Sequence, residues 1–293
     1  MKQYIAFDIG GTHIKYGIVK EGGSVAASFL VDTEAHLGGP AIVQKLIRLS
    51  RGLLKEYSVE GVAISTAGRL DADKGVILGA SNNIPGYKGI DLKKLISEAL
   101  NLRVEARNDA DCAALCEHWL GNHGASSFIM LTVGTGVGGG IIINGELHSG
   151  HSFSAGEWGY MRIEGEQFEK VASFPGLIRM AKEYKGEQEW TGKEVFDAYD
   201  QGDPEIKKAV AKFYKHLAVG ISNLIYIFDP EKVVIGGGIA LRGEVFLKEI
   251  KEEVKKYTNE DFYNRTGLVL ARYQNHSGMV GAVYHFMQRT RGQ

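Results

Sequence analysis

Apolar positions along the chain follow two spacings, one typical of β-strands and one typical of helices. Near the N-terminus, runs rich in β-branched and aromatic residues predict strands at residues 3–9, 13–19 and 25–31. A helical spacing follows at residues 40–57, and the mainly apolar run at 60–65 predicts a buried strand. The predicted order is strand, strand, strand, helix, strand.

A comparable order returns later in the chain. Strands are predicted at residues 127–133 and 139–144, a long helix at 204–228 and a buried strand at 232–235. We therefore expect two domains that share one architecture. Further helices are predicted at residues 91–100, 109–120, 173–184, 192–200, 243–257 and 278–289.

Many of these helical segments carry apolar residues three or four positions apart, which is the spacing of a buried helix face. A length of 293 residues suits two domains, because each can then bury a core of ordinary size. Cys112 and Cys116 lie in an Ala-rich helical segment and are expected as small buried residues on one helix face. A metal pair or a redox pair is the alternative for them, but no further cysteines complete a tetrahedral zinc site. The longest apolar stripe predicts packing and comprises Val210, Phe213, Tyr214, Leu217, Ile221 and Leu224.

The charge balance narrows the choice of partners. The chain has 34 basic and 35 acidic residues, and 44% of its residues are hydrophobic, as in ordinary globular proteins. Its densest basic run, residues 248–256, interleaves lysine with glutamate, so it predicts a solvated helix face and no nucleic-acid partner. The chain starts on a strand-like segment, and no apolar stretch approaches the roughly 18 residues of a membrane span. We expect a cytoplasmic protein with no membrane partner.

A glycine-rich turn separates the first two predicted strands and runs from Asp8 through Gly10 and Gly11 to Thr12. Adjacent glycines expose backbone amides, and Thr12 adds a hydroxyl donor, so the turn can hold a phosphate, with Lys15 close behind it. Asp8 ends a buried strand, where a carboxylate is costly unless it meets a cation, and this favours Mg²⁺ bound through water. The alternative is a plain hairpin in which Asp8 caps the turn.

A second glycine loop begins with Gly134, Thr135 and Gly136 and contains a GxGxxG pattern. A dinucleotide-binding fold would place a helix after it. An isoleucine run closed by an Asn-Gly turn follows instead, which predicts a strand entering a hairpin. Gly192 and Lys193 precede a glutamate, so a P-loop is excluded as well.

A third cluster, Gly236, Gly237 and Gly238, follows a predicted strand. Three glycines leave a surface without side chains, against which a planar adenine ring could lie, although a strand-to-helix turn needs at least one glycine anyway. One hydroxyl-bearing glycine loop in each domain and one glycine surface together suit a triphosphate clamped between two domains. The sequence therefore predicts a nucleotide site.

These motifs resemble the sugar kinase, hexokinase, actin and heat-shock ATPase superfamily, and within it the ROK family of repressors, open reading frames and kinases. The resemblance covers essentially the whole chain. Residues 8–12 are similar to the family's first phosphate motif, 134–136 to its second and 236–238 to its adenosine motif. Residues 107–114 are similar to its Asn-Asp-Ala-Asn-x-Ala segment, at a strand end that opens a helix.

The resemblance implies an α/β fold of two domains, the actin-like ATPase or ribonuclease H-like fold. Each domain is then a mixed five-stranded sheet with flanking helices, and a cleft lies between the domains. The N-terminal domain is expected to comprise residues 1–117 and a C-terminal helix at about 278–293, and the other domain residues 118–277.

The resemblance also implies roles for single residues. Asp109 becomes the catalytic base and, with Asn108, a sugar ligand, while Asn83, Glu157 and Glu169 become further ligands of the sugar hydroxyls. Without the glycine loops, Asn108 and Asp109 could merely cap the helix that follows.

The chain departs from the family pattern at Tyr160. Many members have a histidine there and a cysteine-rich zinc segment shortly afterwards, whereas no cysteine lies between Tyr160 and Glu169. We therefore expect no structural zinc. Because the family's histidine approaches the anomeric end of the sugar, a site with Tyr160 is expected to tolerate a substituent there, as in a β-glucoside such as cellobiose.

The implied reaction is transfer of the γ-phosphate of ATP, with Mg²⁺, to a sugar hydroxyl, expected to be the 6-hydroxyl of a glucose unit. Positioning and charge neutralisation matter more in this reaction than covalent chemistry. A sugar-binding pseudokinase without catalysis is the alternative, and phosphate donors other than ATP stay open, as does a homodimer. A ROK-type repressor needs a DNA-binding module before the first glycine loop, and seven residues precede Asp8, so we expect no such module.

Overall fold

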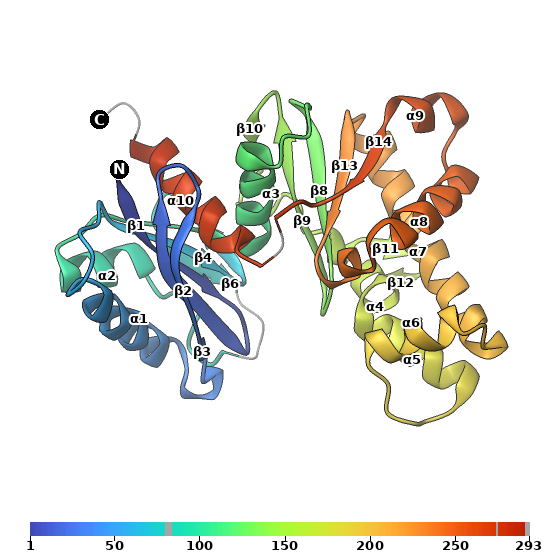
Figure 1. The fold of residues 1–293 in the computed structure, drawn as a ribbon, viewed down its shortest axis with the longest axis horizontal. Helices are drawn as coiled ribbons and strands as arrows, with labels where there is room; N and C mark the ends of the chain where they lie inside the picture. Colours follow the sequence, from blue (N-terminus) through green and yellow to red (C-terminus); the bar gives the residue numbers. More distant parts are fainter. Residues whose placement is uncertain (80–83, 274, 291–293) are drawn as a thin grey trace. The chain divides into compact units, whose positions relative to one another are not determined.

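The computed structural model describes residues 1–79, 84–273 and 275–290. The chain divides into two compact units, each built from separate stretches of sequence. Unit 1 comprises Met1–His123, Leu147–Ala155 and Arg272–Gln293, and unit 2 comprises Gly124–Glu146 and Gly156–Ala271. Each unit contains one five-stranded sheet covered by helices (Figure 1). The predicted class, an α/β fold with such a sheet in each of two domains, is confirmed.

The sheet of unit 1 has the strand order β3-β2-β1-β4-β7. Strands β1 (Gln3–Ile9), β2 (His13–Lys20) and β3 (Val25–Asp32) form an antiparallel meander. Strands β4 (Val62–Thr66) and β7 (Val104–Asn108) continue the sheet in parallel with β1. The carboxyl ends of β1, β4 and β7 therefore meet at one edge of the sheet.

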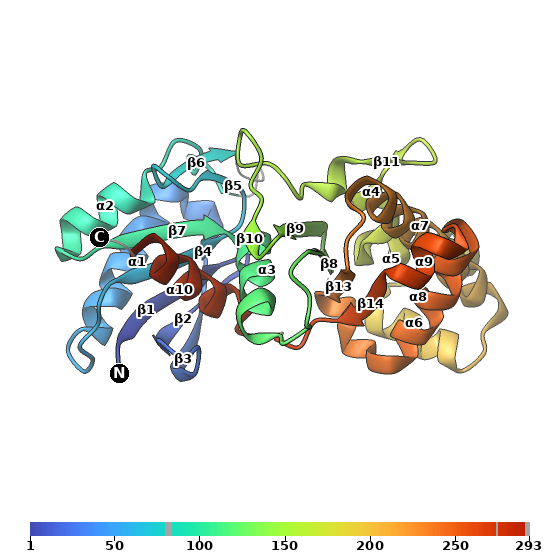
Figure 2. The same ribbon diagram turned by 90° about the horizontal axis from the view of Figure 1, so that it is seen from above.

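Helices cover both faces of this sheet (Figures 1 and 2). Helices α1 (Gly39–Leu53) and α2 (Leu92–Leu100) share one hydrophobic core with the sheet. Helices α3 (Asp109–Leu120) and α10 (Ser277–Thr290) form the core on the other face, and Cys112 and Cys116 are buried in it. The prediction of two small buried residues on one helix face is confirmed. The short elements of this unit are η1 (Ala35–Leu37) and the hairpin β5 (Arg69–Asp71) and β6 (Val76–Gly79).

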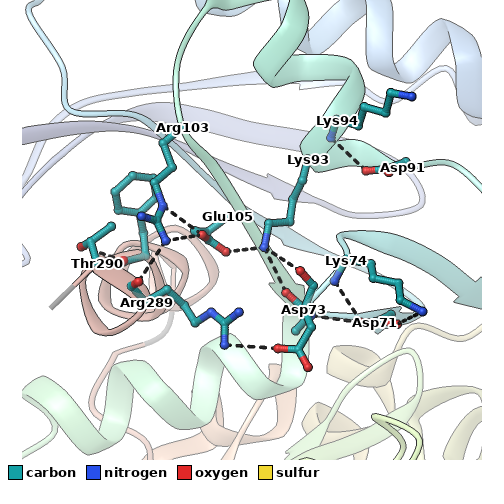
Figure 3. Close-up of polar contacts among 12 residues, drawn as sticks. Asp71, Asp73, Lys74, Asp91, Lys93, Lys94, Arg103, Glu105, Arg289 and Thr290 are labelled. Carbon is teal, nitrogen blue, oxygen red and sulfur yellow. Dashed lines mark hydrogen bonds and ion pairs between the residues drawn. The ribbon is translucent and has the colours of Figure 1, made fainter. Parts of the chain in front are cut away.

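A cluster of charged residues binds the C-terminal helix α10 to the rest of unit 1 (Figure 3). Glu105 on β7 is 3% exposed and lies 2.6 Å from Lys93 Nζ and 3.0 Å from Arg103 Nη2. Arg103 also donates to the carbonyl of Arg289 on α10 at 2.9 Å, and Arg289 pairs with Asp73 at 3.2 Å. The buried carboxylate thus links α2, β7 and α10.

The sheet of unit 2 has the strand order β10-β9-β8-β13-β14. Strands β8 (Phe128–Val133) and β9 (Val137–Ile143) form the hairpin around the second glycine loop, and β10 (Glu146–Leu147) follows them. Strands β13 (Lys232–Gly236) and β14 (Gly267–Leu270) run parallel to β8.

The long helix α7 (Pro204–Phe228) organises the helical part of unit 2. Asp203 caps its first turn by accepting from the amides of Glu205 and Ile206, and Pro204 is its first residue. All six residues of the predicted apolar stripe are buried. The remaining elements are η2 (Trp158–Tyr160), β11 (Arg162–Ile163), β12 (Glu166–Gln167), α4 (Phe168–Ala172), α5 (Phe174–Lys185), α6 (Gly192–Asp200), η3 (Gly238–Arg242), α8 (Gly243–Tyr257) and α9 (Glu260–Arg265).

Two local features differ from what the sequence pattern indicated. The first helix ends at Leu53, earlier than residue 57. The segment Leu147–Ala155, taken from the sequence as part of the C-terminal domain, belongs to unit 1, where Phe153 packs against the core. In the part of the chain that the structure describes, no helix has both the length and the apolar character to cross a membrane.

Candidate active site

The first glycine loop connects β1 to β2 and is closed by backbone bonds. The amide of Gly10 donates to the carbonyl of His13 at 3.0 Å, and the Gly10 carbonyl accepts from Thr33 Oγ1 at 2.7 Å. Gly11 and Thr12 are exposed at the tip, with open space around the position of a Cβ on Gly11. The loop is therefore fixed at its base and accessible at its tip, as a phosphate-binding turn must be.

Asp8 lies at the base of this loop. Its carboxylate accepts from Ser65 Oγ at 2.8 Å, and burial raises the pKa of the group, an effect that Ser65, Lys15 and His276 partly oppose. Gly278 in α10 packs directly against it, since a Cβ there would lie 2.4 Å from the carboxylate. A negative charge confined in this way is stabilised by a cation.

Lys15 stands opposite Asp8 in the β1–β2 pair. Its ammonium donates to the carbonyl of Asn275 at 2.8 Å, just before α10 begins. Lys15 therefore links the first glycine loop to the start of the C-terminal helix.

Asn108 and Asp109 stand where β7 ends and α3 begins. Asn108 Oδ1 accepts from the amides of Ala110 and Asp111 at 2.9 and 3.2 Å, and its Nδ2 donates to the carbonyl of Gly68 at 2.9 Å. Asn108 is thus the helix cap, and its hydrogen bonds to described residues use one of its two N–H groups. Asp109 is exposed, and its Oδ1 accepts from the amide of Ala110.

A buried tyrosine supports this turn from below. Tyr87 Oη lies 2.7 Å from Thr66 Oγ1, and Thr66 pairs with Asn108 in the β4–β7 ladder. Burial, with a smaller contribution from the charge of Asp109, raises the pKa of Tyr87 to about 12. The phenol therefore stays protonated and serves as a fixed support. Neither Ser65 nor this pair was predicted as part of the site, although a polar residue at the end of an apolar strand is a usable signal for Ser65.

Arg107, the residue before Asn108, is also buried. Its Nε donates to Asp111 Oδ2, in the first turn of α3, at 2.9 Å, and its Nη2 donates to Ser149 Oγ. Burial raises the pKa of the Asp111 carboxyl, while the Arg107 charge opposes that shift. The ion pair gives the buried aspartate at 111, where the family pattern has asparagine, a counter-charge. Arg107 also connects the segment that contains Ser149 to the end of β7.

The second glycine loop, in unit 2, is in contact with Glu169. The amide of Val137 donates to Glu169 Oε2 at 3.2 Å, and a Cβ on Gly136 would lie 2.4 Å from the same oxygen. At its start, the carbonyl of Gly134 accepts from the amide of Phe174, the first residue of α5. The neighbouring Thr135 is exposed. The structure therefore joins a predicted sugar ligand to a predicted phosphate loop within unit 2.

Glu157 and Tyr160 flank a buried tryptophan that fixes their segment to the sheet. Trp158 Nε1 donates to the carbonyl of Met130 at 3.3 Å. Gly156, two residues before Trp158, has a φ of 91°. It packs so closely against β9 that a Cβ on it would lie 2.3 Å from the carbonyl oxygen of Gly139. Glu157 and Tyr160 are both exposed, Tyr160 to 72%.

The glycines of the third cluster each have a packing partner. A Cβ on Gly236 would meet Met130, and one on Gly238 would meet the Phe174 ring, both at 2.6 Å. Gly237 has a φ of 80° and lies against the backbone of Val133. Contacts within unit 2 alone therefore account for these glycines. They also bring the cluster beside the second glycine loop, since a Cβ on Gly134 would lie 3.7 Å from the amide nitrogen of Gly238.

The candidate residues thus form two groups. Unit 1 contains Asp8, Gly10, Gly11, Thr12, Lys15, Asn108 and Asp109. Unit 2 contains Gly134, Thr135, Gly136, Glu157, Tyr160, Glu169, Gly236, Gly237 and Gly238. Asn83, also predicted as a sugar ligand, lies outside the described residues.

Comparison with known proteins gives a consistent result. The model of the ROK family matches residues 4–289. A β-glucoside kinase from Listeria monocytogenes is 36% identical, over 97% of this chain and 97% of that protein. A glucokinase from Halalkalibacterium halodurans is 31% identical, over 95% of this chain and 93% of that protein.

A solved structure of a ROK family protein has the same fold as this chain. The structure of a ROK family glucokinase from Streptomyces griseus, in complex with glucose and AMPPNP, superposes with a TM-score of 0.82. It is 30% identical and covers 96% of this chain and 97% of its own. The chain therefore belongs to the ROK family, as one of its carbohydrate kinases.

Proposed function

We propose that this kinase transfers the γ-phosphate of ATP to the 6-hydroxyl of a glucose unit, either free or in a β-glucoside such as cellobiose. The observation that carries the proposal is the start of α3. There an exposed carboxylate, Asp109, follows a helix cap, Asn108, that hydrogen bonds hold in place, in the same unit as the first glycine loop. A base that has to meet a ligand needs this combination of exposure and rigid support.

Tyr160 supports the choice of a β-glucoside. It stands where the family pattern has histidine, and its side chain is 72% exposed. Its segment is attached to the sheet of unit 2 by the hydrogen bond from Trp158 to the carbonyl of Met130. An aromatic ring offers a face for stacking on a second sugar ring. The relatives named β-glucoside kinase, at 36% and 35% identity, point in the same direction.

The residues fit a nucleotide with a magnesium ion. Glycine amides and the hydroxyls of Thr12 and Thr135 would bind the phosphates, and the surface at Gly236, Gly237 and Gly238 would face the adenosine. Asp8 would hold Mg²⁺ through water, because it is a confined carboxylate whose charge a cation offsets. Bound there, the ion would neutralise phosphate charge during transfer. No three His, Cys, Asp or Glu side chains gather as a metal cage in the described part of the chain, so phosphates and waters would complete the coordination.

In this mechanism Asp109 takes the proton of the attacking sugar hydroxyl as the hydroxyl oxygen bonds to the γ-phosphorus. The bond from that phosphorus to the bridging oxygen breaks, and ADP leaves with the electron pair. Asn108 and Glu157 orient the sugar, and Glu169 does so from its place against the second glycine loop. Asn83 is proposed as a further ligand. Holding one hydroxyl in line with the γ-phosphate contributes more to the rate than proton removal, since the transition state is loose.

The proposal is tested by ADP release measured over glucose, mannose, fructose, N-acetyl sugars, cellobiose and gentiobiose, each with ATP and Mg²⁺. We expect the highest kcat/KM on a glucose unit, with cellobiose or gentiobiose at least equal to glucose. Turnover of glucose without turnover of either disaccharide would remove the β-glucoside assignment. Sugar binding without ADP release on any acceptor would favour a pseudokinase.

A further inference from the structure

One buried carboxylate, at the end of α3 opposite to Asp109, holds the chain at two points. The chain first leaves unit 1 after His123, and it finally returns there at Arg272. The side chain of Glu117 has no exposed surface. It accepts hydrogen bonds from residues at both of these points.

Both oxygens of the Glu117 carboxylate are occupied. His123 Nε2 lies 2.6 Å from Oε2, and because a carboxylate only accepts, the ring N–H is the donor. The amide of Arg272 donates to the same oxygen at 3.1 Å, and the amide of Tyr273 donates to Oε1 at 2.6 Å. Such a set of donors is what permits a carboxylate to be fully buried.

The residue that follows α3 leaves room for this cluster. A Cβ on Gly121 would lie 2.4 Å from the carbonyl oxygen of Glu117, 2.5 Å from Glu117 Oε2 and 2.7 Å from His123 Nε2. The φ of Gly121 is −65°, an ordinary helical value. Close packing against the backbone and the carboxylate of Glu117, and no special backbone conformation, therefore requires a glycine here.

We infer that Glu117 is a positioning residue for phosphoryl transfer. Through His123, Arg272 and Tyr273 it fixes the points of attachment of unit 2 to α3, the helix whose first residue is Asp109. The inference rests on the proposed function, because alignment matters only if groups of unit 2 present a substrate to Asp109. Misplacement of reacting groups by ~1 Å costs up to roughly 100-fold in rate.

The test uses the full chain with Gly121→Ala, and Gly52→Ala as its control. Gly52 lies in α1, and no atom of the described residues would lie within 4 Å of an added Cβ, so alanine there is expected to leave the activity unchanged. In Gly121→Ala, measured well below its melting temperature, kcat on the best acceptor is expected to fall roughly tenfold. The KM for ATP is expected to stay within about a factor of two, because the glycine surfaces of unit 2 are intact. A lower Tm with the kcat of wild type would overturn the inference.

A second pair of variants serves if Gly121→Ala does not fold. His123→Ala removes one donor to Glu117, whereas His123→Gln keeps an N–H that can reach it. We expect His123→Ala to lose turnover and His123→Gln to restore a large part of it. Wild-type kcat in both variants would contradict a positioning role.

A third measurement is independent of catalysis. Spin labels on Glu98→Cys in α2 and Lys248→Cys in α8 report the distance distribution between the two units, while Cys112 and Cys116 are buried and out of reach of the label. Gly121→Ala is expected to broaden this distribution, and Gly52→Ala to leave it unchanged. If no acceptor supports ADP release by the wild type, the proposed function fails, and the distance distribution still decides whether Glu117 fixes the attachment. An unchanged distribution in Gly121→Ala counts against the inference.

Discussion

At the level of single residues, the side chain of Asp109 is the most direct target. Asp109→Asn keeps the shape of the side chain and an oxygen for the amide of Ala110, but it removes the basic oxygen. We expect kcat to fall by roughly 10² or more. ATP binding, measured by calorimetry, should be retained because the glycine loops are unaltered. Asp261→Asn, at an exposed position in the first turn of α9, is the control and should turn over like the wild type.

Tyr160 allows a prediction about specificity. Tyr160→His restores the residue of the family pattern, and we expect it to lower the ratio of kcat/KM for cellobiose to kcat/KM for glucose by about tenfold. The reason is that a histidine near the anomeric oxygen favours a free hydroxyl over a glycosyl substituent. Tyr184→His, on an exposed tyrosine of α5, controls for the loss of a phenol. An unchanged ratio would show that Tyr160 does not select the acceptor.

The site residues that the sequence suggested are those whose function constrains the chain locally. Glycine runs and an Asn-Asp pair are visible as patterns of neighbouring residues. Ser65 and Tyr87 were missed because their roles depend on partners far along the chain. Ser65 donates to Asp8, and Tyr87 bonds Thr66 beneath the turn of Asn108. No spacing rule relates such pairs before the sheet order is known.

At the level of elements, the charged strand β7 gives a prediction about stability. Glu105 is buried between Lys93 and Arg103. Arg103 also donates to the carbonyl of Arg289 and so binds α10. Glu105→Gln leaves two cations without their counter-charge, so we expect the free energy of unfolding to fall by ~3 kcal/mol. Urea denaturation followed by circular dichroism measures it. Glu98→Gln, on an exposed glutamate of α2, should change it by less than about 0.5 kcal/mol.

Most of the longer helices were predicted closely, whereas several strands and the short helices α4 and α9 were not, for a physical reason. Helices α3, α6, α7 and α8 begin and end where the periodicity placed them, because apolar spacing and local caps such as Asp203 define a helix from within. Strand β7 contains Glu105 and Arg107, whose burial depends on ion pairs with other elements. Strand β14 and the hairpin β5–β6 are only a few residues long, too short for a period to show.

At the level of the whole molecule, the division into units follows from contacts between distant parts of the sequence. Segment Leu147–Ala155 lies between strands of unit 2 in sequence yet belongs to unit 1. Arg107 donates to Ser149, and Arg69 donates to Ser154 at 3.3 Å. The composition of Leu147–Ala155 does not indicate that the segment belongs to unit 1. A domain boundary drawn from the sequence therefore could not place it there.

The stability of the molecule should depend on pH through a buried histidine. His285 in α10 has its pKa held well below the ordinary 6.5, first by burial and then by the charges of Arg107, Arg289 and Lys93. Its Nε2 has no hydrogen-bond partner among the residues that the structure describes, so folding keeps the ring neutral. Below pH 6.5 the unfolded chain therefore binds a proton that the folded chain does not, and the stability present above that pH is lost as the pH falls.

The expected slope from this one group is at most about 1.4 kcal/mol per pH unit. Urea denaturation at several values between about pH 5 and pH 8 measures it. His285→Leu removes the titrating group, so its stability should fall less steeply with acid than that of wild type. His118 and His216, whose pKa values are also lowered by burial, remain in the variant and account for the slope that is left. Parallel curves for the variant and the wild type would mean that His285 takes up its proton equally in both states, and that acid acts on this fold through other groups.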